Sequence, residues 1–284
     1  MNQGRTEDAG EQDSEPRIQG AFPILRVSGI TVFLHWSWLI VAVLVVQHRS
    51  GRYHSPVFNV LEYLSLFGLV LLHEFGHALA CRSVGGRADR ILLWPLGGVA
   101  YVEPPQRPGA VLWSIVAGPL VNVVLAPVLI APVLLMMSWG VGDTHPDLFN
   151  LMVAVAGINV ILLVFNLMPV YPLDGGQILR ALLWFLLGRA NSLIIATVIG
   201  LVGVVGVILL AVMLKSILVG VMAFFILMSC WRGLVGALAM AKLEKVPLRV
   251  DFVCPSCETA PRAGAFWACN RCGTRFDTFK TNAT

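Results

Sequence analysis

Two histidines and a glutamate, His73, Glu74 and His77, have the spacing HExxH and lie inside a long apolar run. On a helix the two histidines are one turn apart on the same face, so both imidazoles can reach a single metal ion. Glu74 lies beside them as a general base for a water whose pKa a zinc ion lowers from about 15.7 to about 7. Two helical histidines can also serve packing alone, but ionisable side chains are costly in an apolar span and usually mark function. The pattern therefore predicts a metal site that needs a third protein ligand.

Asp174 is the natural candidate for that third ligand. It follows a point where two prolines interrupt an apolar stretch, and it precedes a glycine pair. Irregular backbone at membrane depth is tolerated only where it is buried in protein or lines a wet cavity. Asp174 could instead cap the helix that resumes at Gly175, but the proline-flanked break favours a further role. We therefore expect Asp174 to meet His73 and His77.

A further polar residue at membrane depth is Asn122, in the span predicted for residues 110–139. An amide in an apolar helix needs a hydrogen-bond partner. That partner could be a neighbouring helix, or it could be the substrate or another group of the active site. Both interpretations of Asn122 stay open at this point.

The composition is that of a membrane protein. Of the 284 residues, 57% are hydrophobic and only 13% are charged, which is too apolar for an ordinary soluble domain. Several runs reach the roughly 20 apolar residues that a spanning helix needs. The net charge of +4 is small and spread through loops, so it indicates topology and no nucleic-acid partner is expected.

The hydropathy pattern predicts an α-helical polytopic membrane protein with about six transmembrane helices. Between the second and third spans, residues 83–109 combine β-forming residues with proline and glycine pairs, which predicts a short re-entrant or β-hairpin segment. Exposed backbone there could pair with an extended substrate, and an ordinary loop on the membrane surface fits equally well. The predicted spans are residues 31–47, 57–82, 110–139, an interrupted stretch from 148, 191–214 and 216–231.

Four segments are predicted along the chain: a disordered polar tail (1–24), a membrane domain (25–241), a charged linker (242–250) and a small C-terminal module (251–284). With six spans, both termini lie on one side of the bilayer. The loops of that side hold most of the arginines and lysines, so we expect both termini in the cytoplasm. The chain is expected to be a multi-pass protein of the plasma membrane.

The C-terminal module contains two CxxC pairs, the ligand spacing of a zinc ribbon. Four thiolates complete a tetrahedral structural site with no open position, and a segment this short needs such a staple to fold. A rubredoxin-like iron centre uses similar ligands and is the alternative. Aromatic residues near the cysteines could face a cytoplasmic partner or simply pack around the metal. The predicted ligands are Cys254, Cys257, Cys269 and Cys272.

Together these motifs resemble those of the site-2 protease family of intramembrane zinc metalloproteases. The resemblance covers roughly residues 25–240. It rests on the HExxH sequence, on Gly118-Pro119 followed by Asn122, and on residues 166–175, which match the pattern NxxPxxPLDG.

The resemblance implies a catalytic zinc with His73, His77 and Asp174 as ligands and Glu74 as general base. Asn166 is implied to orient the substrate or stabilise the oxyanion, and Asn122 is the second candidate for that role. The implied activity is hydrolysis of peptide bonds in or near transmembrane segments of membrane-protein substrates, as in regulated proteolysis. The expected partners are such a substrate and the lipid bilayer, and the expected cofactors are one catalytic and one structural Zn²⁺.

Two other functions compete with proteolysis. A catalytically silent membrane receptor or adaptor could bind transmembrane helices, although the intact set of ligands argues against it. A metal-ion transporter would need more polar residues along a path through all the spans, and the sequence lacks them.

Overall fold

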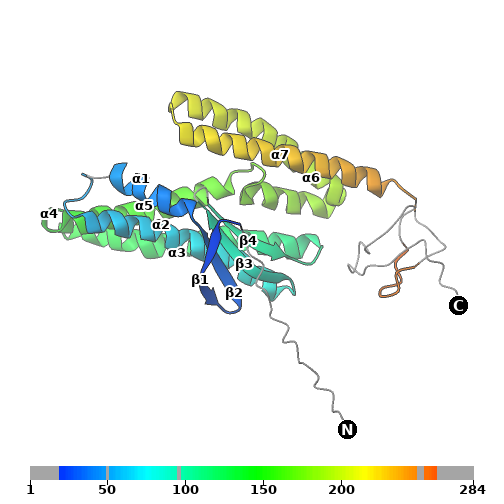
Figure 1. Cartoon of the computed structure of the whole chain (residues 1–284), viewed down its shortest axis with the longest axis horizontal. Coiled ribbons are helices and arrows are strands. Elements are labelled where there is room, and N and C mark those ends of the chain that lie inside the picture. Colours follow the sequence, from blue (N-terminus) through cyan, green and yellow to red (C-terminus); the bar gives the residue numbers. More distant parts are fainter. Residues whose placement is uncertain (1–18, 49–50, 95–96, 248–252, 261–284) are drawn as a thin grey trace, which may run out of the picture.

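The computed structural model of the chain describes residues 19–48, 51–94, 97–247 and 253–260. Figure 1 shows long helices with a small sheet packed beside them. The strands are β1 (Ala21–Val27), β2 (Ile30–His35), β3 (Arg87–Trp94) and β4 (Gly97–Glu103). The helices are α1 (Ser37–His48), α2 (Pro56–Ser83), α3 (Pro108–Ser138), α4 (Val141–Thr144), α5 (Pro146–Leu167), α6 (Asp174–Met213) and α7 (Ile217–Glu244).

Within the described residues, five helices are long and apolar enough to cross a membrane: α2, α3, α5, α6 and the part of α7 from Val219 to Glu244. A helix rises about 1.5 Å per residue, so each exceeds a hydrocarbon thickness of about 30 Å. The prediction of a mostly α-helical, multi-pass membrane protein is therefore confirmed.

The prediction that residues 31–47 form one spanning helix is wrong. The beginning of this stretch belongs to strand β2, and the helix α1 that follows has only 12 residues. Such a helix is about 18 Å long, too short to cross the bilayer by itself. Hydropathy alone counted an apolar strand together with an apolar helix, because the strand is buried against protein. Strand β1 likewise begins at Ala21, inside the polar tail predicted for residues 1–24.

The strands form one sheet in the order β1-β2-β3-β4. Strands β1 and β2 are antiparallel, β2 and β3 are parallel, and β3 and β4 form the antiparallel hairpin predicted within residues 83–109. The hairpin is thus confirmed, whereas its pairing with an N-terminal hairpin was not predicted. Strand β4 lies at one edge of the sheet, beside α2.

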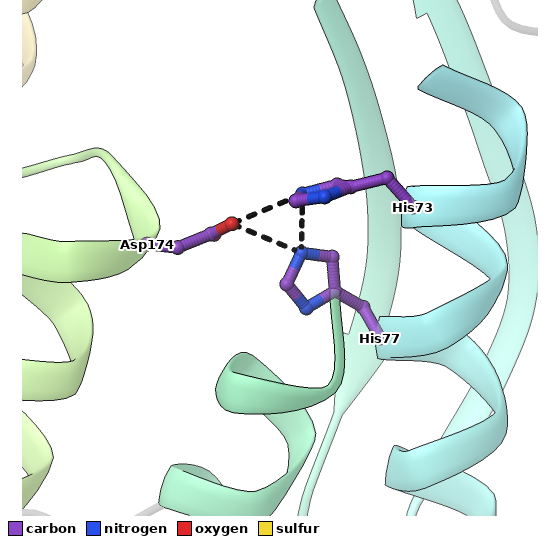
Figure 2. Close-up of side chains that lie close together, drawn as sticks. All are labelled: His73, His77 and Asp174. Atoms are coloured by element: carbon purple, nitrogen blue, oxygen red, sulfur yellow. Dashed lines mark hydrogen bonds and ion pairs between the residues drawn. The ribbon is translucent and has the colours of Figure 1, made fainter. Parts of the chain in front are cut away.

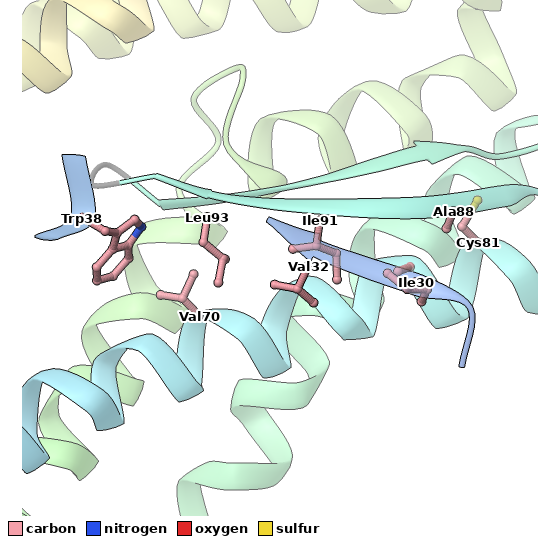
Figure 3. Close-up of a cluster of buried hydrophobic side chains, with 9 residues drawn as sticks. Ile30, Val32, Trp38, Val70, Cys81, Ala88, Ile91 and Leu93 are labelled. Atoms are coloured by element: carbon pink, nitrogen blue, oxygen red, sulfur yellow. The ribbon is translucent and has the colours of Figure 1, made fainter. Parts of the chain in front are cut away.

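One face of this sheet packs against α2 and forms the main hydrophobic core (Figure 3). Alternate residues of β2 and β3 point to that face, as the two-residue period of a strand requires. Burying these side chains fixes α2 on the sheet and leaves another face of the helix for the histidines. The cluster consists of Ile30, Val32, Trp38, Val70, Ala78, Cys81, Ala88, Ile91 and Leu93.

Helix α6 consists of two arms that meet at Gly188. This residue has φ 77° and ψ 175°, a left-handed, non-helical conformation that favours glycine. A β-carbon on Gly176 would meet Tyr171, and so would one on Gly200. In a straight helix these glycines would be about 36 Å apart, so the second arm must turn back alongside the first (Figure 1).

Candidate active site

The two histidines of the HExxH sequence and Asp174 converge on one point (Figure 2). Asp174 Oδ2 lies 3.0 Å from His73 Nε2 and 3.4 Å from His77 Nε2, and the two Nε2 atoms are 3.1 Å apart. The histidines project from the last third of α2, and Asp174 begins α6 directly after the break that follows α5. The three side chains predicted to meet are therefore brought together.

The other ring nitrogen of each histidine is held by a buried acceptor. His73 Nδ1 lies 2.7 Å from Asn122 Oδ1, and His77 Nδ1 lies 2.9 Å from the carbonyl oxygen of Ser114. Each Nδ1 must carry the proton to donate to an oxygen, so in a neutral imidazole the lone pair is on Nε2. Both lone pairs then point at each other and at the Asp174 carboxylate.

This donor set fits a divalent cation. Two imidazole lone pairs and a carboxylate oxygen that face one another repel, unless positive charge lies between them. Ligands about 2.0 Å from a tetrahedral zinc ion are roughly 3.3 Å apart, close to the spacing of these three atoms. Asp174 Oδ2 is buried without a hydrogen bond from the described residues, as expected of an atom reserved for a metal. The site fits a catalytic zinc with an open fourth position.

Asn122 is fixed by a second asparagine that the sequence analysis missed. Asn122 Nδ2 donates to Asn159 Oδ1 at 2.9 Å, and Asn159 Nδ2 donates to the Asn122 carbonyl oxygen at 3.0 Å. Both side chains are completely buried between α3 and α5. Asn122 therefore makes a hydrogen bond between helices, to Asn159, and also contacts an active-site group, His73. The same signal, an amide inside an apolar span, would have identified Asn159.

Glycines allow α3 to lie directly against the donors. A β-carbon on Gly118 would be 2.2 Å from His77 Nε2 and 2.9 Å from His73 Nε2, and one on Gly76 would be 2.6 Å from the Ala117 carbonyl oxygen. Such distances are far below van der Waals contact. Gly118 thus leaves room at the point where the three donors converge.

Glu74 is the neighbour of the donors on the sheet side. Its Oε2 accepts a hydrogen bond from the Ala100 backbone amide of β4 at 2.8 Å. A β-carbon on Gly98 would be 2.4 Å from Glu74 Cγ, so this glycine lets β4 approach the carboxylate closely. The side chain is only 7% exposed. Strand β4 therefore orients a buried carboxylate beside the candidate metal position.

A cavity of about 420 Å³ opens onto this site. Its lining combines the donor residues and Glu74 with the β4 edge, the end of α5 and the break before α6. Asn166 is half-buried and lines the cavity, as does Gln177, whose Nε2 donates to the Pro172 carbonyl oxygen at 2.9 Å. The cavity thus connects the donors with the β4 edge and the break before α6.

Comparison with known proteins identifies the family. The profile of peptidase family M50 matches residues 62–146 and 142–212, more than half of the chain. The chain belongs to peptidase family M50. A zinc metalloprotease of Methanocaldococcus jannaschii is 30% identical over 62% of this chain and 50% of its own length. Stage IV sporulation protein FB of Bacillus subtilis is 33% identical over 41% of this chain and 38% of its own length.

A solved structure agrees with this M50 membership. The structure of the site-2 protease from Methanocaldococcus jannaschii aligns with a TM-score of 0.53 and 27% identity, and covers 75% of this chain and 95% of that one. The chain spans about half the length or less of the curated relatives it matches. The resemblance seen in the motifs is thereby confirmed for the M50 domain.

The predicted zinc ribbon lies outside the matched M50 region, and the structure describes only part of it. Cys254 and Cys257 lie on a tight turn in which the Glu258 amide donates to the Cys254 carbonyl oxygen at 2.9 Å. Cys254 is buried and Cys257 is half-buried. The other two predicted ligands, Cys269 and Cys272, lie outside the described residues.

Proposed function

We propose that the chain is a zinc-dependent intramembrane endopeptidase that hydrolyses peptide bonds in or near transmembrane segments of membrane proteins. The observation that carries this proposal is the convergence of three inward-facing donors beside a carboxylate, in a buried cavity among membrane-length helices. Membership of peptidase family M50 supports the same activity. A substrate must be locally extended to react, because a helical peptide bond is shielded by its own backbone.

In this proposal His73, His77 and Asp174 hold the zinc. Bound there, zinc would lower the pKa of a water to about 7 and polarise the carbonyl of the scissile bond. The protein contributes orientation: Asn122 and the Ser114 carbonyl oxygen fix both imidazole rings with Nε2 inward. Such supporting hydrogen bonds hold metal ligands in the productive tautomer.

Glu74 is proposed as the general base. The Ala100 amide occupies Oε2, and among the described residues no hydrogen bond reaches Oε1. Oε1 is thereby left to accept a proton from the attacking water and to deliver it to the departing amine. Holding one oxygen while the other stays available keeps the carboxylate in a single orientation during both transfers.

Substrate binding is proposed along β4 and the break before α6. Gly98, Val99, Ala100 and Val102 line the cavity from an edge strand, where an extended peptide can add by backbone hydrogen bonds. Asn166 also lines the cavity and is proposed to orient the scissile carbonyl or stabilise its oxyanion. Asn122 has its amide engaged by His73 and Asn159, so it acts on the ligand rather than on the substrate.

The test is cleavage of a labelled transmembrane substrate by the purified chain, with bound zinc counted by elemental analysis. Wild-type protein should cut the substrate and hold zinc in the membrane domain, and His77→Ala should do neither. The alternative, a silent receptor that binds transmembrane helices, requires that zinc-loaded wild-type protein binds the same substrate without cutting it. That result would refute the peptidase.

We also propose a plasma-membrane location with both termini in the cytoplasm. Arg82 donates to the carbonyl oxygens of Ser28 and Gly29, so the N-terminal hairpin lies at the C-terminal end of α2. The start of α3 lies at the same end, because Trp113 Nε1 donates to Ser83 Oγ. Phe185 approaches Gly109 of α3, so the bend of α6 is at this end too, and α7 packs along α6. This end is rich in arginine, as expected of a cytoplasmic side. Asp143→Cys should react with an impermeant maleimide on intact cells, and Arg107→Cys should not.

The C-terminal module is proposed as a structural zinc ribbon with Cys254, Cys257, Cys269 and Cys272 as ligands, available to a cytoplasmic partner. The turn at Cys254 supports it, because it brings the first two cysteines to one side of a tight loop. Wild-type protein should hold a second zinc ion that Cys269→Ser removes, with the membrane zinc retained. A single zinc per chain, unaffected by Cys269→Ser, would refute the ribbon.

A further inference from the structure

Two arginines of α6 lie against one tryptophan at the Gly188 bend. Arg180 Cζ is 5.9 Å from the centroid of the Trp184 ring, and Arg189 Cζ is 5.8 Å from it. Arg180 belongs to the first arm and Arg189 begins the second arm, so the bend brings two guanidinium groups to one indole. Neither residue lines the zinc cavity.

Within the described part of the chain, these two positive charges have no counter-charge. Among the described residues, no carboxylate forms an ion pair with Arg180 or Arg189, and no acceptor bonds to either guanidinium. The Nε atom of each is buried without a hydrogen-bond partner. Stacking on Trp184 is favourable, but it satisfies no N–H donor, and unpaired guanidinium groups in an apolar helix are costly. Such an arrangement is what an anion-binding site requires.

The pair lies at the boundary of the membrane domain. Trp184 packs on the cluster formed by Val111, Ile115 and Ala181, which belongs to the first turns of α3 and the first arm of α6. Next to it, Leu182 is 50% exposed and Leu186 is 84% exposed. An anion bound by the arginines would therefore be adjacent to an exposed apolar surface.

We propose that Arg180 and Arg189 bind the phosphate of an anionic phospholipid, with Trp184 holding both guanidinium groups in place. A guanidinium presents a planar fork of donors that matches phosphate oxygens, and two forks can bind one phosphate from two sides. Basic pockets between transmembrane helices, with tryptophan at the level of the headgroups, suit such lipids. The exposed leucines of α6 would contact the acyl chains. This site is independent of the zinc chemistry proposed above.

The experiment measures the melting temperature of the purified full chain in neutral micelles with added phosphatidylglycerol, phosphatidylcholine or inorganic phosphate. Phosphatidylglycerol should stabilise the wild type and phosphatidylcholine should not. In the double variant Arg180→Gln/Arg189→Gln, the apparent affinity for phosphatidylglycerol should fall by about tenfold or more, since charged hydrogen bonds are lost. Arg232→Gln, which changes an exposed arginine of α7, should leave it unchanged.

An equal phosphatidylglycerol shift in the double variant and the wild type would overturn the proposal. A full shift with inorganic phosphate alone would overturn its assignment to a lipid, because the shared phosphate chemistry would then serve a soluble anion. Should the double glutamine variant fail to give a monodisperse peak, Arg180→Lys/Arg189→Lys replaces it. That variant keeps both charges but loses the forks, so weaker phosphatidylglycerol binding is expected and unchanged binding contradicts the proposal.

Discussion

Helix α2 contains two buried glutamates whose surroundings differ completely. Glu62 is 5% exposed and Glu74 is 7% exposed, and they are about 18 Å apart along the same helix. Glu62 accepts a hydrogen bond of 2.5 Å from the Tyr53 hydroxyl and lies 3.7 Å from Arg52 Nε. Glu74 receives one backbone amide from β4 and otherwise faces two histidines and a cavity.

The same residue type can thus stabilise a membrane fold at one depth and serve chemistry at another. A buried carboxylate is costly unless it is hydrogen-bonded and paired. At Glu62 a phenol and an arginine meet that cost, so the carboxylate connects α2 to the preceding loop. At Glu74 the partners are the candidate zinc site and the space for substrate, so the carboxylate is ready for proton transfer.

The largest effect should come from the same substitution made at both positions. Glu74→Gln removes the proposed base while leaving all three zinc donors, so proteolysis should fall by a factor of about 10³ or more with zinc retained. Glu62→Gln, the matched control, keeps an acceptor for Tyr53 and should stay within about twofold of wild-type activity. Comparable activity of the two variants would contradict the assignment of Glu74.

A second prediction tests the space between the donors. Gly118→Ala would place a β-carbon 2.2 Å from His77 Nε2, so the histidines must move and zinc should be lost together with activity. Gly68→Ala is the control on α2, because a β-carbon there meets nothing within 4 Å. Zinc content measured on both purified variants decides the point: a zinc-loaded Gly118→Ala protein would show that the donors do not hold the metal in this geometry.

A third prediction concerns the amide that fixes His73. Asn122→Ala removes the acceptor for His73 Nδ1 and the donor to Asn159 Oδ1, so zinc affinity should fall by about 10- to 100-fold. The readout is zinc competition with a chelator rather than activity alone. Asn122→Asp keeps an acceptor for His73 and should recover part of the affinity, whereas a purely structural role for Asn122 predicts no recovery.

The sequence predicted the chemistry of the site better than the architecture that builds it. HExxH and the proline-flanked Asp174 were recognisable because charged and irregular segments are rare in apolar spans. The acceptor for His77 is the Ser114 backbone carbonyl oxygen, which no side-chain pattern can reveal. Likewise, Gly98 matters because it has no β-carbon, which lets β4 approach Glu74 closely.

The N-terminal region was misread for a physical reason. Along β2 the side chains of Ile30 and Val32 are completely buried against α2, so an apolar strand continues directly into the apolar helix α1. Hydropathy cannot separate burial in protein from burial in lipid. The bend at Gly188 lies just before residue 191, where the fifth span was predicted to begin, so a break in the helix was expected there and only the left-handed backbone of the glycine was not.

The smallest effect should come from the loop residue that donates to Glu62. Tyr53→Phe removes the buried hydroxyl that donates to Glu62, so the free energy of unfolding should fall by about 1–3 kcal/mol. Activity at a temperature where the protein stays folded should be unchanged, because Glu62 is about 18 Å from Glu74 along α2.

Tyr101→Phe is the control: this tyrosine of β4 is 44% exposed, so losing its hydroxyl should cost little stability. Thermal unfolding of the two variants under identical micelle conditions measures the difference in their stability. Loss of proteolysis by folded Tyr53→Phe protein would mean that the two glutamates are coupled, and that the structural role assigned to Glu62 is incomplete.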